Sequence, residues 1–230
     1  MNRNSTNKIN YFLDNWMPPV LRDCKFFMRI LLRIGIGKKY SYYMDFKKRL
    51  PTLKETDINK YYRVLADTFI KRETDLNKAC IERILSEEMG EIILDAAAGK
   101  GFMAGRILNN YPEKIVTVSD IVLPPFSERI DGIKYVKASL TKMPFEDKTF
   151  DTVICTHALE HIKDIQGALS ELRRVCRNKL IIVLPRQREY LYTFDLHINF
   201  FPYKYNVENI LNNSATIELL DNDWYCVEYI

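Results

Sequence analysis

Short apolar runs alternate with helical stretches from residue 91 to residue 185, and this alternation constrains the fold more than any other feature of the chain. The runs read EIILDA, KIVTVSD, IKYVKA, FDTVICT and KLIIVLP, and their isoleucines and valines are typical of buried strands. Strands that alternate with helices predict a parallel sheet with helices on both faces. Two later runs, ATIELLD and WYCVEYI, flank Asn222 and Asp223 and predict an antiparallel hairpin at a sheet edge. We therefore expect an α/β fold with a doubly wound, seven-stranded sheet, mostly parallel, that ends in an antiparallel C-terminal hairpin.

The part of the chain before this sheet has a helical pattern. Residues 1–74 are expected to form a helical N-terminal extension, and residues 75–230 are expected to form the sheet domain. Within residues 51–89, Thr56 and Thr74 are candidate N-caps, and Gly90 is a candidate C-terminal stop.

Residues 18–36 predict a basic amphipathic helix. Four cations recur three or four positions apart and five apolar residues are available to another face: Arg22, Lys25, Arg29 and Arg33, and Phe26, Phe27, Ile30, Leu31 and Ile34. Residues 1–60 also hold 13 Lys and Arg against 5 Asp and Glu, so the positive charge is concentrated there. The helix has two interpretations: peripheral contact with an anionic membrane surface, or the commoner case of packing on the domain with its charges in solvent.

Composition excludes several classes of protein. The 230 residues are 47% hydrophobic and 28% charged, which is the balance of a folded globular chain. The five cysteines are scattered without a CxxC pair, so neither a disulfide framework nor a metal site is expected, and a reducing cytoplasm fits them best. We expect no transmembrane helix and no signal peptide. Nucleic acid is not an expected partner, because the basic segment contains no recognisable binding module and the rest of the chain is net acidic.

The segment DAAAGKG places small residues at Ala97, Gly99 and Gly101, directly after a predicted strand and at the start of a helix. Small side chains let a ligand lie against the backbone. Asp120 ends the second strand, 25 residues after Asp95, where a carboxylate can accept hydrogen bonds from ribose hydroxyls. The pattern alone leaves open a nucleotide-type ligand, a dinucleotide, or close packing without a ligand.

Residues 138–164, ASLTKMPFEDKTFDTVICTHALEHIKD, add a Met-Pro-Phe corner, a Phe-Asp pair that opens a strand, and a histidine segment after it. With the glycine turn, the sequence resembles the class I S-adenosylmethionine-dependent methyltransferases over residues 79–185, in the group that shares LPF…D…FD…V…LEH. The resemblance implies a Rossmann-like sheet and S-adenosylmethionine as the cofactor. It also implies cofactor-binding roles for Asp95, Ala96, Ala97, Gly99 and Gly101 at the methionine end, Asp120 at the ribose, and Ile121, Ser139 and Leu140 at the adenine, and it implies that Thr156 and His157 lie beside the sulfonium.

Three positions depart from the family pattern. Ala97 replaces the usual first glycine, a change that we expect to be tolerated only with a negative φ. Ser139 stands where the family often has an adenine-binding aspartate. The segment CRNKL replaces a Pro-Gly-Gly turn, so a tight turn is expected at Asn178.

A methyl group on a positive sulfur is already activated, so such an enzyme aligns a nucleophile and, for a hydroxyl acceptor, removes a proton. His157 follows the fourth strand and is the first candidate for this base, while His161 is interpreted as structural, within a helix. Tyr61 and Tyr62 are expected either to form part of a lid over the cofactor, as N-terminal segments do in similar enzymes, or to pack in the core.

The loop after the fifth strand, PRQREYLYTFDLHINFF, is dense in functional groups. Asp195 and His197, two positions apart, are predicted to act together in catalysis as carboxylate and imidazole. Arg186 and Arg188 are predicted to clamp a phosphate or carboxylate of the acceptor, with Tyr192 as a further substrate contact. The alternative is that the charges of this loop are solvated and its aromatic residues are core.

The sequence therefore predicts O-methylation of a small molecule or of a glycan precursor, lipid-linked or phosphorylated. Two alternatives stay open: C- or N-methylation of a quinone-type or amine metabolite, and a catalytically inactive protein that binds the cofactor or a partner on the same fold. The expected location is the cytoplasm, with peripheral contact at the inner face of the membrane as an open alternative. The acceptor and the oligomeric state are not predicted.

Overall fold

The computed structural model describes residues 11–13, 15–54, 56–58, 60–61, 73–192 and 196–230. The chain divides into two compact units. The helical unit comprises residues 1–72 and 187–200, and the sheet unit comprises residues 73–186 and 201–230.

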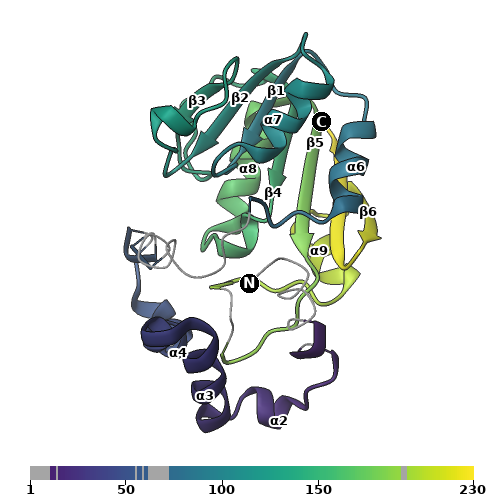
Figure 1. The fold of residues 1–230 in the computed structure, drawn as a ribbon. Coiled ribbons are helices and arrows are strands. Elements are labelled where there is room, and N and C mark those ends of the chain that lie inside the picture. Colours follow the sequence, from purple (N-terminus) through teal and green to yellow (C-terminus); the bar gives the residue numbers. More distant parts are fainter. Residues whose placement is uncertain (1–10, 14, 55, 59, 62–72, 193–195) are drawn as a thin grey trace. The chain divides into compact units, whose positions relative to one another are not determined.

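The sheet unit is built on seven strands in the order β3-β2-β1-β4-β5-β7-β6 (Figure 1). The first five are parallel to their neighbours, whereas β7 pairs antiparallel with both β5 and β6. This arrangement confirms the predicted seven-stranded, mostly parallel sheet with an antiparallel C-terminal hairpin. The strands are β1 (Ile92–Ala96), β2 (Ile115–Asp120), β3 (Lys134–Lys137), β4 (Phe150–Thr156), β5 (Cys176–Pro185), β6 (Ala215–Leu220) and β7 (Asp223–Tyr229).

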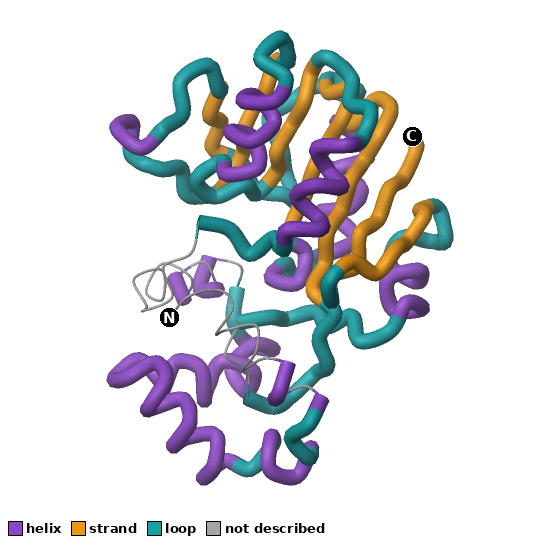
Figure 2. The backbone as a smooth tube through the Cα atoms, turned by 45° about the vertical axis from the view of Figure 1, so that its right-hand side comes forward, coloured by secondary structure: helices purple, strands orange, loops and turns teal. Residues whose placement is uncertain are grey.

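Helices cover both faces of the sheet, as Figure 2 shows. Side chains of α8 and α9 pack in one core and those of α6 and α7 in the other, because successive strand residues point to opposite faces. In β5, for example, Leu180 and Ile182 belong to the first core, and Ile181 and Val183 belong to the second. The helices are α6 (Lys78–Ser86), α7 (Phe102–Asn110), α8 (Ile165–Val175) and α9 (Lys204–Ile210), with the 3₁₀ turns η3 (Phe126–Glu128) and η4 (Leu159–His161).

Four local expectations in the sheet unit were wrong. The N-cap of α6 is Asn77, whose side chain accepts a hydrogen bond from the Cys80 amide, and not Thr74, whose hydroxyl accepts from the Leu76 amide. No turn forms at Asn178, because α8 ends at Val175 and β5 begins at Cys176. His161 lies in η4 and not in an α-helix.

The fourth expectation concerned Gly90, which does not stop α6, since that helix already ends at Ser86. A Cβ atom at Gly90 would lie 2.2 Å from the Cβ of Asp151. The glycine is therefore required by close packing before β1, where the Asp151 carboxylate accepts from the Ile92 amide at 2.9 Å and pairs with Arg177 at 2.7 Å.

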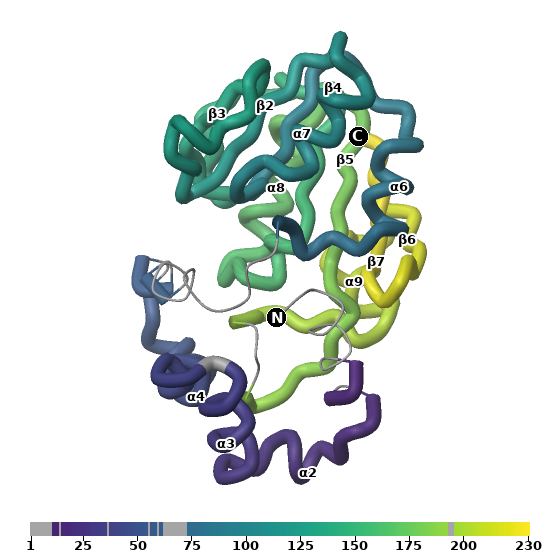
Figure 3. The backbone as a smooth tube through the Cα atoms, viewed as in Figure 1, coloured from purple at the N-terminus to yellow at the C-terminus, as the bar shows by residue number. Residues whose placement is uncertain are grey.

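The helical unit contains α2 (Pro19–Arg22), α3 (Lys25–Ile36), η1 (Gly37–Lys39), α4 (Tyr40–Arg49) and η2 (Leu50–Thr52), which Figure 3 colours purple to blue. The helix predicted for residues 18–36 is thus broken at Asp23 and Cys24. Buried side chains of α3 and α4 form the core of this unit with Tyr192 and Leu196 from the returning loop.

Arg22 was grouped with the exposed cations, but it is almost fully buried. Its Nη1 atom donates to the Tyr192 carbonyl at 2.7 Å, and its guanidinium lies 4.4 Å from the centre of the Tyr190 ring. The carboxylate of the adjacent Asp23 accepts from the Leu191 amide at 2.7 Å. These contacts tie residues 187–192 to the helical unit. Among the described residues, no helix is long and apolar enough to span a membrane.

Candidate active site at the carboxyl ends of the parallel strands

The turn between β1 and α7 is left-handed at three positions. Ala97, Gly99 and Gly101 have φ values of 55°, 56° and 83°. A Cβ atom at Gly101 would approach the Tyr135 hydroxyl at 3.1 Å, whereas a Cβ at Gly99 would meet nothing within 4 Å. Gly99 therefore leaves open space beside the backbone, which a ligand can occupy. The expectation of a negative φ at Ala97 was wrong, and the alanine carries the strain of a left-handed residue.

Asp95 lies in the core at the end of β1. Its Oδ2 atom accepts from the Ala104 amide at 3.0 Å, near the start of α7. Burial raises the pKa of this carboxyl to about 7; the Ala104 hydrogen bond opposes the rise, and the charge of Asp120 adds to it. Ala96, the last residue of β1, is fully buried. A cationic ligand group next to Asp95 would therefore favour its ionised form.

Asp120, the last residue of β2, links the loop after β1 to the loop after β2. Its Oδ2 atom accepts from the Gly99 amide at 2.8 Å, and its Oδ1 atom accepts from the Val122 amide at 2.9 Å. Burial raises its pKa, and these amides oppose the rise. Each carboxylate oxygen can accept more than one hydrogen bond, so Asp120 can still bind hydroxyl groups. A carboxylate beside the open space at Gly99 fits the ribose of a nucleoside cofactor.

The remaining predicted cofactor residues lie after β2, after β3 and at the end of β4. Ile121 and Ser139 are partly buried, and Leu140 is buried in the core between the sheet and α8. The Ser139 hydroxyl lies 3.0 Å from that of Thr141, so part of its hydrogen-bonding capacity is used locally. Thr156 ends β4 opposite Val183 of β5. The cofactor contacts of these four residues stay predictions.

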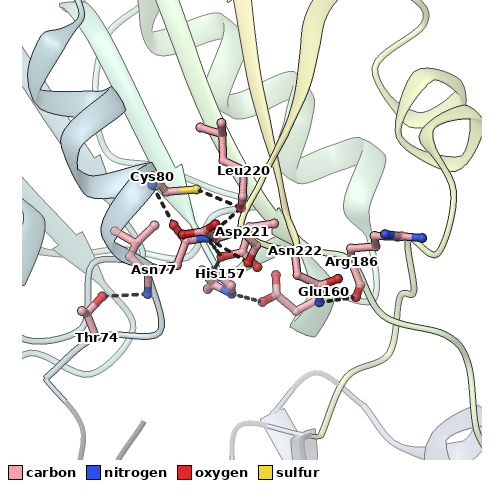
Figure 4. Close-up of polar contacts among 11 residues, drawn as sticks. Thr74, Asn77, Cys80, His157, Glu160, Arg186, Leu220, Asp221 and Asn222 are labelled. Atoms are coloured by element: carbon pink, nitrogen blue, oxygen red, sulfur yellow. Dashed lines mark hydrogen bonds and ion pairs between the residues drawn. The ribbon is translucent and has the colours of Figure 1, made fainter. Parts of the chain in front are cut away.

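His157 is partly buried between two carboxylates directly after β4 (Figure 4). Its Nε2 atom lies 3.1 Å from Oδ2 of Asp223, and its Nδ1 atom lies 3.5 Å from Oε1 of Glu160. Burial disfavours the charged ring, but the two carboxylates outweigh it and raise the pKa of His157 to about 10. The ring is therefore an imidazolium at neutral pH, with no free lone pair to accept a proton.

Asn77 holds Asp223 in place from the start of α6. Its Nδ2 atom donates to Oδ2 of Asp223 at 2.9 Å and to the Leu220 carbonyl at 2.8 Å. Its Oδ1 atom accepts from the Cys80 amide at 2.7 Å (Figure 4). Asn77, His157, Glu160 and Asp223, hereafter the His157 cluster, thus join α6, the segment after β4 and the start of β7.

The second oxygen of Glu160 differs from the rest of the cluster. Glu160 is 1% exposed, and its Oε2 atom has no hydrogen-bond partner within the described part of the chain. An unpaired buried carboxylate oxygen is costly. It is therefore a candidate to accept a hydrogen bond from a ligand.

Comparison with known proteins agrees with this geometry. The family model described as a methyltransferase domain matches residues 94–184. These residues form a methyltransferase domain. The predicted resemblance to methyltransferases is thereby confirmed for residues 94–184.

Relatives and solved structures extend the match beyond the methyltransferase domain. An uncharacterized methyltransferase from Mycobacterium sp. (strain JLS) is 29% identical over 56% of this chain and 51% of that protein. A ubiquinone/menaquinone biosynthesis C-methyltransferase from Paracoccus denitrificans is 30% identical over 40% of this chain and 41% of that protein. The chain therefore spans about half the length of the curated relatives it matches.

Among solved structures, the Burkholderia thailandensis 1,6-didemethyltoxoflavin-N1-methyltransferase, with 1,6-didemethyltoxoflavin and S-adenosylhomocysteine bound, covers 76% of this chain and 85% of its own. The TM-score is 0.56 and the sequence identity is 16%, so this likeness supports the fold alone.

The predicted acceptor residues are divided between the two units. Arg186 belongs to the sheet unit, where it is exposed and its Nε atom donates to the Pro202 carbonyl at 3.4 Å. Arg188, Tyr192 and His197 belong to the helical unit. There Tyr192 and His197 are buried, and Nδ1 of His197 is hydrogen-bonded to the Gln187 side chain.

Two of the predicted residues, Tyr62 and Asp195, lie outside the described residues. Tyr61 is described, and its ring packs on those of Tyr42 and Phe46 at centroid distances of 5.8 and 5.4 Å. The catalytic pairing of Asp195 with His197 and the roles of Arg186, Arg188 and Tyr192 stay predictions.

Sequence reasoning missed Asn77, Glu160 and Asp223 as members of the His157 cluster in the sheet unit. Glu160 is the glutamate of the quoted LEH pattern, which could have marked it, but no role was assigned to its carboxylate. Asp223 was interpreted as part of the hairpin turn, and it reaches His157 because β7 inserts between β5 and β6. That insertion is a property of the sheet topology, and no local pattern around Asp223 reveals it.

Proposed function

We propose that the chain is an S-adenosylmethionine-dependent methyltransferase that acts on a small-molecule acceptor. The observation that carries the proposal is the left-handed turn at 97–101, with the open side of Gly99 beside the carboxylate of Asp120. The match of residues 94–184 to a methyltransferase domain supports it. S-adenosylhomocysteine in the Burkholderia enzyme supports the choice of cofactor.

The residues at the turn fit the parts of this cofactor. We propose that Asp95 faces the methionine ammonium, because a buried carboxyl with a pKa of about 7 gains from an adjacent cation. We propose that Asp120 accepts hydrogen bonds from the ribose hydroxyls and that the backbone at Gly99 approaches the ligand closely. When bound, S-adenosylmethionine supplies a methyl group activated by the positive charge of its sulfur.

The His157 cluster bears on which acceptor atom is methylated. An imidazolium cannot remove the proton of a hydroxyl acceptor, so we propose that His157 is a positioning residue and not the base. O-methylation, including that of a lipid-linked or phosphorylated glycan precursor, would then need another proton acceptor. Glu160 meets this need, because its Oε2 atom is buried without a partner among the described residues.

Methylation of a nucleophilic carbon or nitrogen needs no such base, and it is the second candidate. The observation that favours it is the pair of carboxylates beside His157, at 3.1 and 3.5 Å, which raise the pKa of its ring to about 10. The names of the Paracoccus C-methyltransferase and the Burkholderia N1-methyltransferase agree with this candidate.

The proposal is tested by measuring S-adenosylhomocysteine release with phenol, glycan phosphate, quinol and amine acceptors. We expect turnover with at least one class, and Glu160→Gln then separates the two candidates. O-methylation should lose kcat with an unchanged KM for the cofactor, whereas C- or N-methylation should be nearly unaffected. Cofactor binding without turnover on any class would contradict the enzyme proposal and favour an inactive binding protein.

A further inference from the structure

The exposed side of α3 carries a continuous apolar stripe. Phe26, Ile30 and Ile34 are 75%, 44% and 79% exposed. Residues four positions apart on a helix lie one above the other on the same face. The apolar residues that pack in the core of the helical unit are different ones, chiefly Met28 and Leu32, which are fully buried. The amphipathic helix therefore packs and still leaves an apolar stripe in solvent.

A cationic stripe runs beside the apolar one. Lys25, Arg29 and Arg33 are all exposed, and each precedes a residue of the apolar stripe by one position. The helix contains no acidic residue. Arg29 also donates to the Tyr40 hydroxyl at 3.2 Å, which holds its side chain at the helix surface. The two stripes together form a face that is apolar along one edge and positive along the other.

Further large apolar side chains are exposed in the residues before α3. Trp16 is 72% exposed and Val20 is 82% exposed. Tryptophan is enriched at the boundary between lipid headgroups and hydrocarbon, because its ring is apolar and its N–H group is polar. Exposed apolar residues in such a group mark a docking surface more often than a solvated one.

The charge of this face of α3 distinguishes between two possible binding partners, a second copy of the chain and a membrane. A second copy of this chain, docked symmetrically, would place like charges against like charges. An anionic bilayer accepts the apolar side chains at its acyl boundary and the cations at its headgroups. We propose that the face of α3 formed by residues 25, 26, 29, 30, 33 and 34 docks on an anionic phospholipid membrane.

The test is co-sedimentation of the full chain with vesicles of phosphatidylcholine mixed with phosphatidylglycerol. We expect binding to these vesicles, weaker binding to phosphatidylcholine alone, and a decrease in binding as the salt concentration rises. The double variant Phe26→Ser/Ile34→Ser should lower the partition coefficient at least about tenfold. The double variant Lys25→Gln/Arg33→Gln should lower it about 25-fold, on the basis of roughly fivefold for each cation beside an anionic surface.

Two matched control variants test whether a loss of vesicle binding is specific to the two stripes of α3 or follows from any loss of exposed charge or apolar surface. Lys48→Gln/Arg49→Gln removes the same charge from exposed positions of α4. Phe126→Ser/Ile115→Ser removes exposed apolar side chains from the sheet unit. Both control pairs should retain more than about half of the binding. All substituted side chains are exposed, so the variants should fold, which circular dichroism verifies.

Three outcomes would overturn the proposal. The first is no binding to anionic vesicles at low salt. The second is an equal loss of binding in the stripe and control variants. The third is a wild-type dimer that Phe26→Ser/Ile34→Ser dissociates in analytical ultracentrifugation, which would assign the face to a second copy. The vesicle assay contains neither cofactor nor acceptor, so its outcome is independent of the methyltransferase proposal.

Discussion

Replacing His157 tests whether the ring is a buried cation. The pKa of His157 rises from 6.5 to about 10 because the carboxylates of Asp223 and Glu160 outweigh the cost of burial. At about 1.4 kcal/mol per pH unit, this rise corresponds to about 5 kcal/mol. Removing one partner of a buried ion pair costs about 3–5 kcal/mol. His157→Asn should therefore destabilise the sheet unit by about 3–5 kcal/mol at pH 6.5. Asparagine is the suitable replacement, because it tolerates the φ of 48° found at this position.

The raised pKa of His157 determines how the stability difference changes with pH. Consider a group whose pKa is higher in the folded protein than in the unfolded chain. It stabilises the fold fully at a pH below its pKa in the unfolded chain, and this stabilisation is lost as the pH rises to its pKa in the folded protein. The stability difference between wild type and His157→Asn should therefore be largest below about pH 6.5 and begin to fall there. It should shrink by about 1.4 kcal/mol per pH unit up to about pH 10.

Urea unfolding monitored by Trp224 fluorescence measures this difference. The chain has two tryptophans, so a Trp16→Phe background leaves only Trp224, which is buried in β7 beside Asp223. His161→Asn, four residues along the same segment, is the matched control for the loss of an imidazole. Parallel stability curves for wild type and His157→Asn between pH 6.5 and 10 would refute the charged state of His157.

Three further predictions concern the turn and the cluster. Ala97→Gly should raise the free energy of unfolding by about 1 kcal/mol, measured by urea unfolding, because glycine removes the strain of an alanine at a φ of 55°; a loss of stability would contradict that strain. Binding of S-adenosylhomocysteine should weaken about tenfold per pH unit below pH 7, since protonated Asp95 cannot pair with the ligand ammonium, and calorimetry of Asp95→Asn should show a flat profile. Asp223→Asn should lower the pKa of His157, measured by ¹³C NMR of the imidazole, by at least two pH units, because Asp223 is its nearest carboxylate; an unchanged pKa would assign the shift to Glu160.

The strands of the sheet could be predicted from the sequence because each is a separate apolar run with a local signal. Residues 92–96, 115–120 and 150–156 are rich in isoleucine and valine and are mostly buried on both faces, as a parallel strand between two helical layers requires. The beginning of β5 was not predicted, because a turn was expected at Asn178. In the structure β5 begins at Cys176, directly after the end of α8, and no turn separates the two elements. The expected turn rested on a family pattern that this chain lacks.

The helical unit and the His157 cluster were harder to predict for a different reason. The burial of Arg22 depends on Tyr190 and Tyr192, about 170 residues later in the chain. The charge of His157 depends on Asp223, 66 residues away, in a strand that inserts next to β5. Contacts of such long range leave no periodicity in the local sequence. The small-residue turn between β1 and α7 was predictable because all its small residues lie within one segment.

The central claim is tested most directly by calorimetric titration with S-adenosylmethionine and S-adenosylhomocysteine, with NADH as the control ligand. The wild type should bind the first two and not the third. Asp120→Ala should lose at least tenfold in affinity, about 1.4 kcal/mol, while Asp131→Ala, a matched exposed carboxylate, should bind as the wild type does. Absence of binding to both adenosyl ligands, or equal affinity in Asp120→Ala, would contradict the assignment of the turn at 97–101 as the cofactor site.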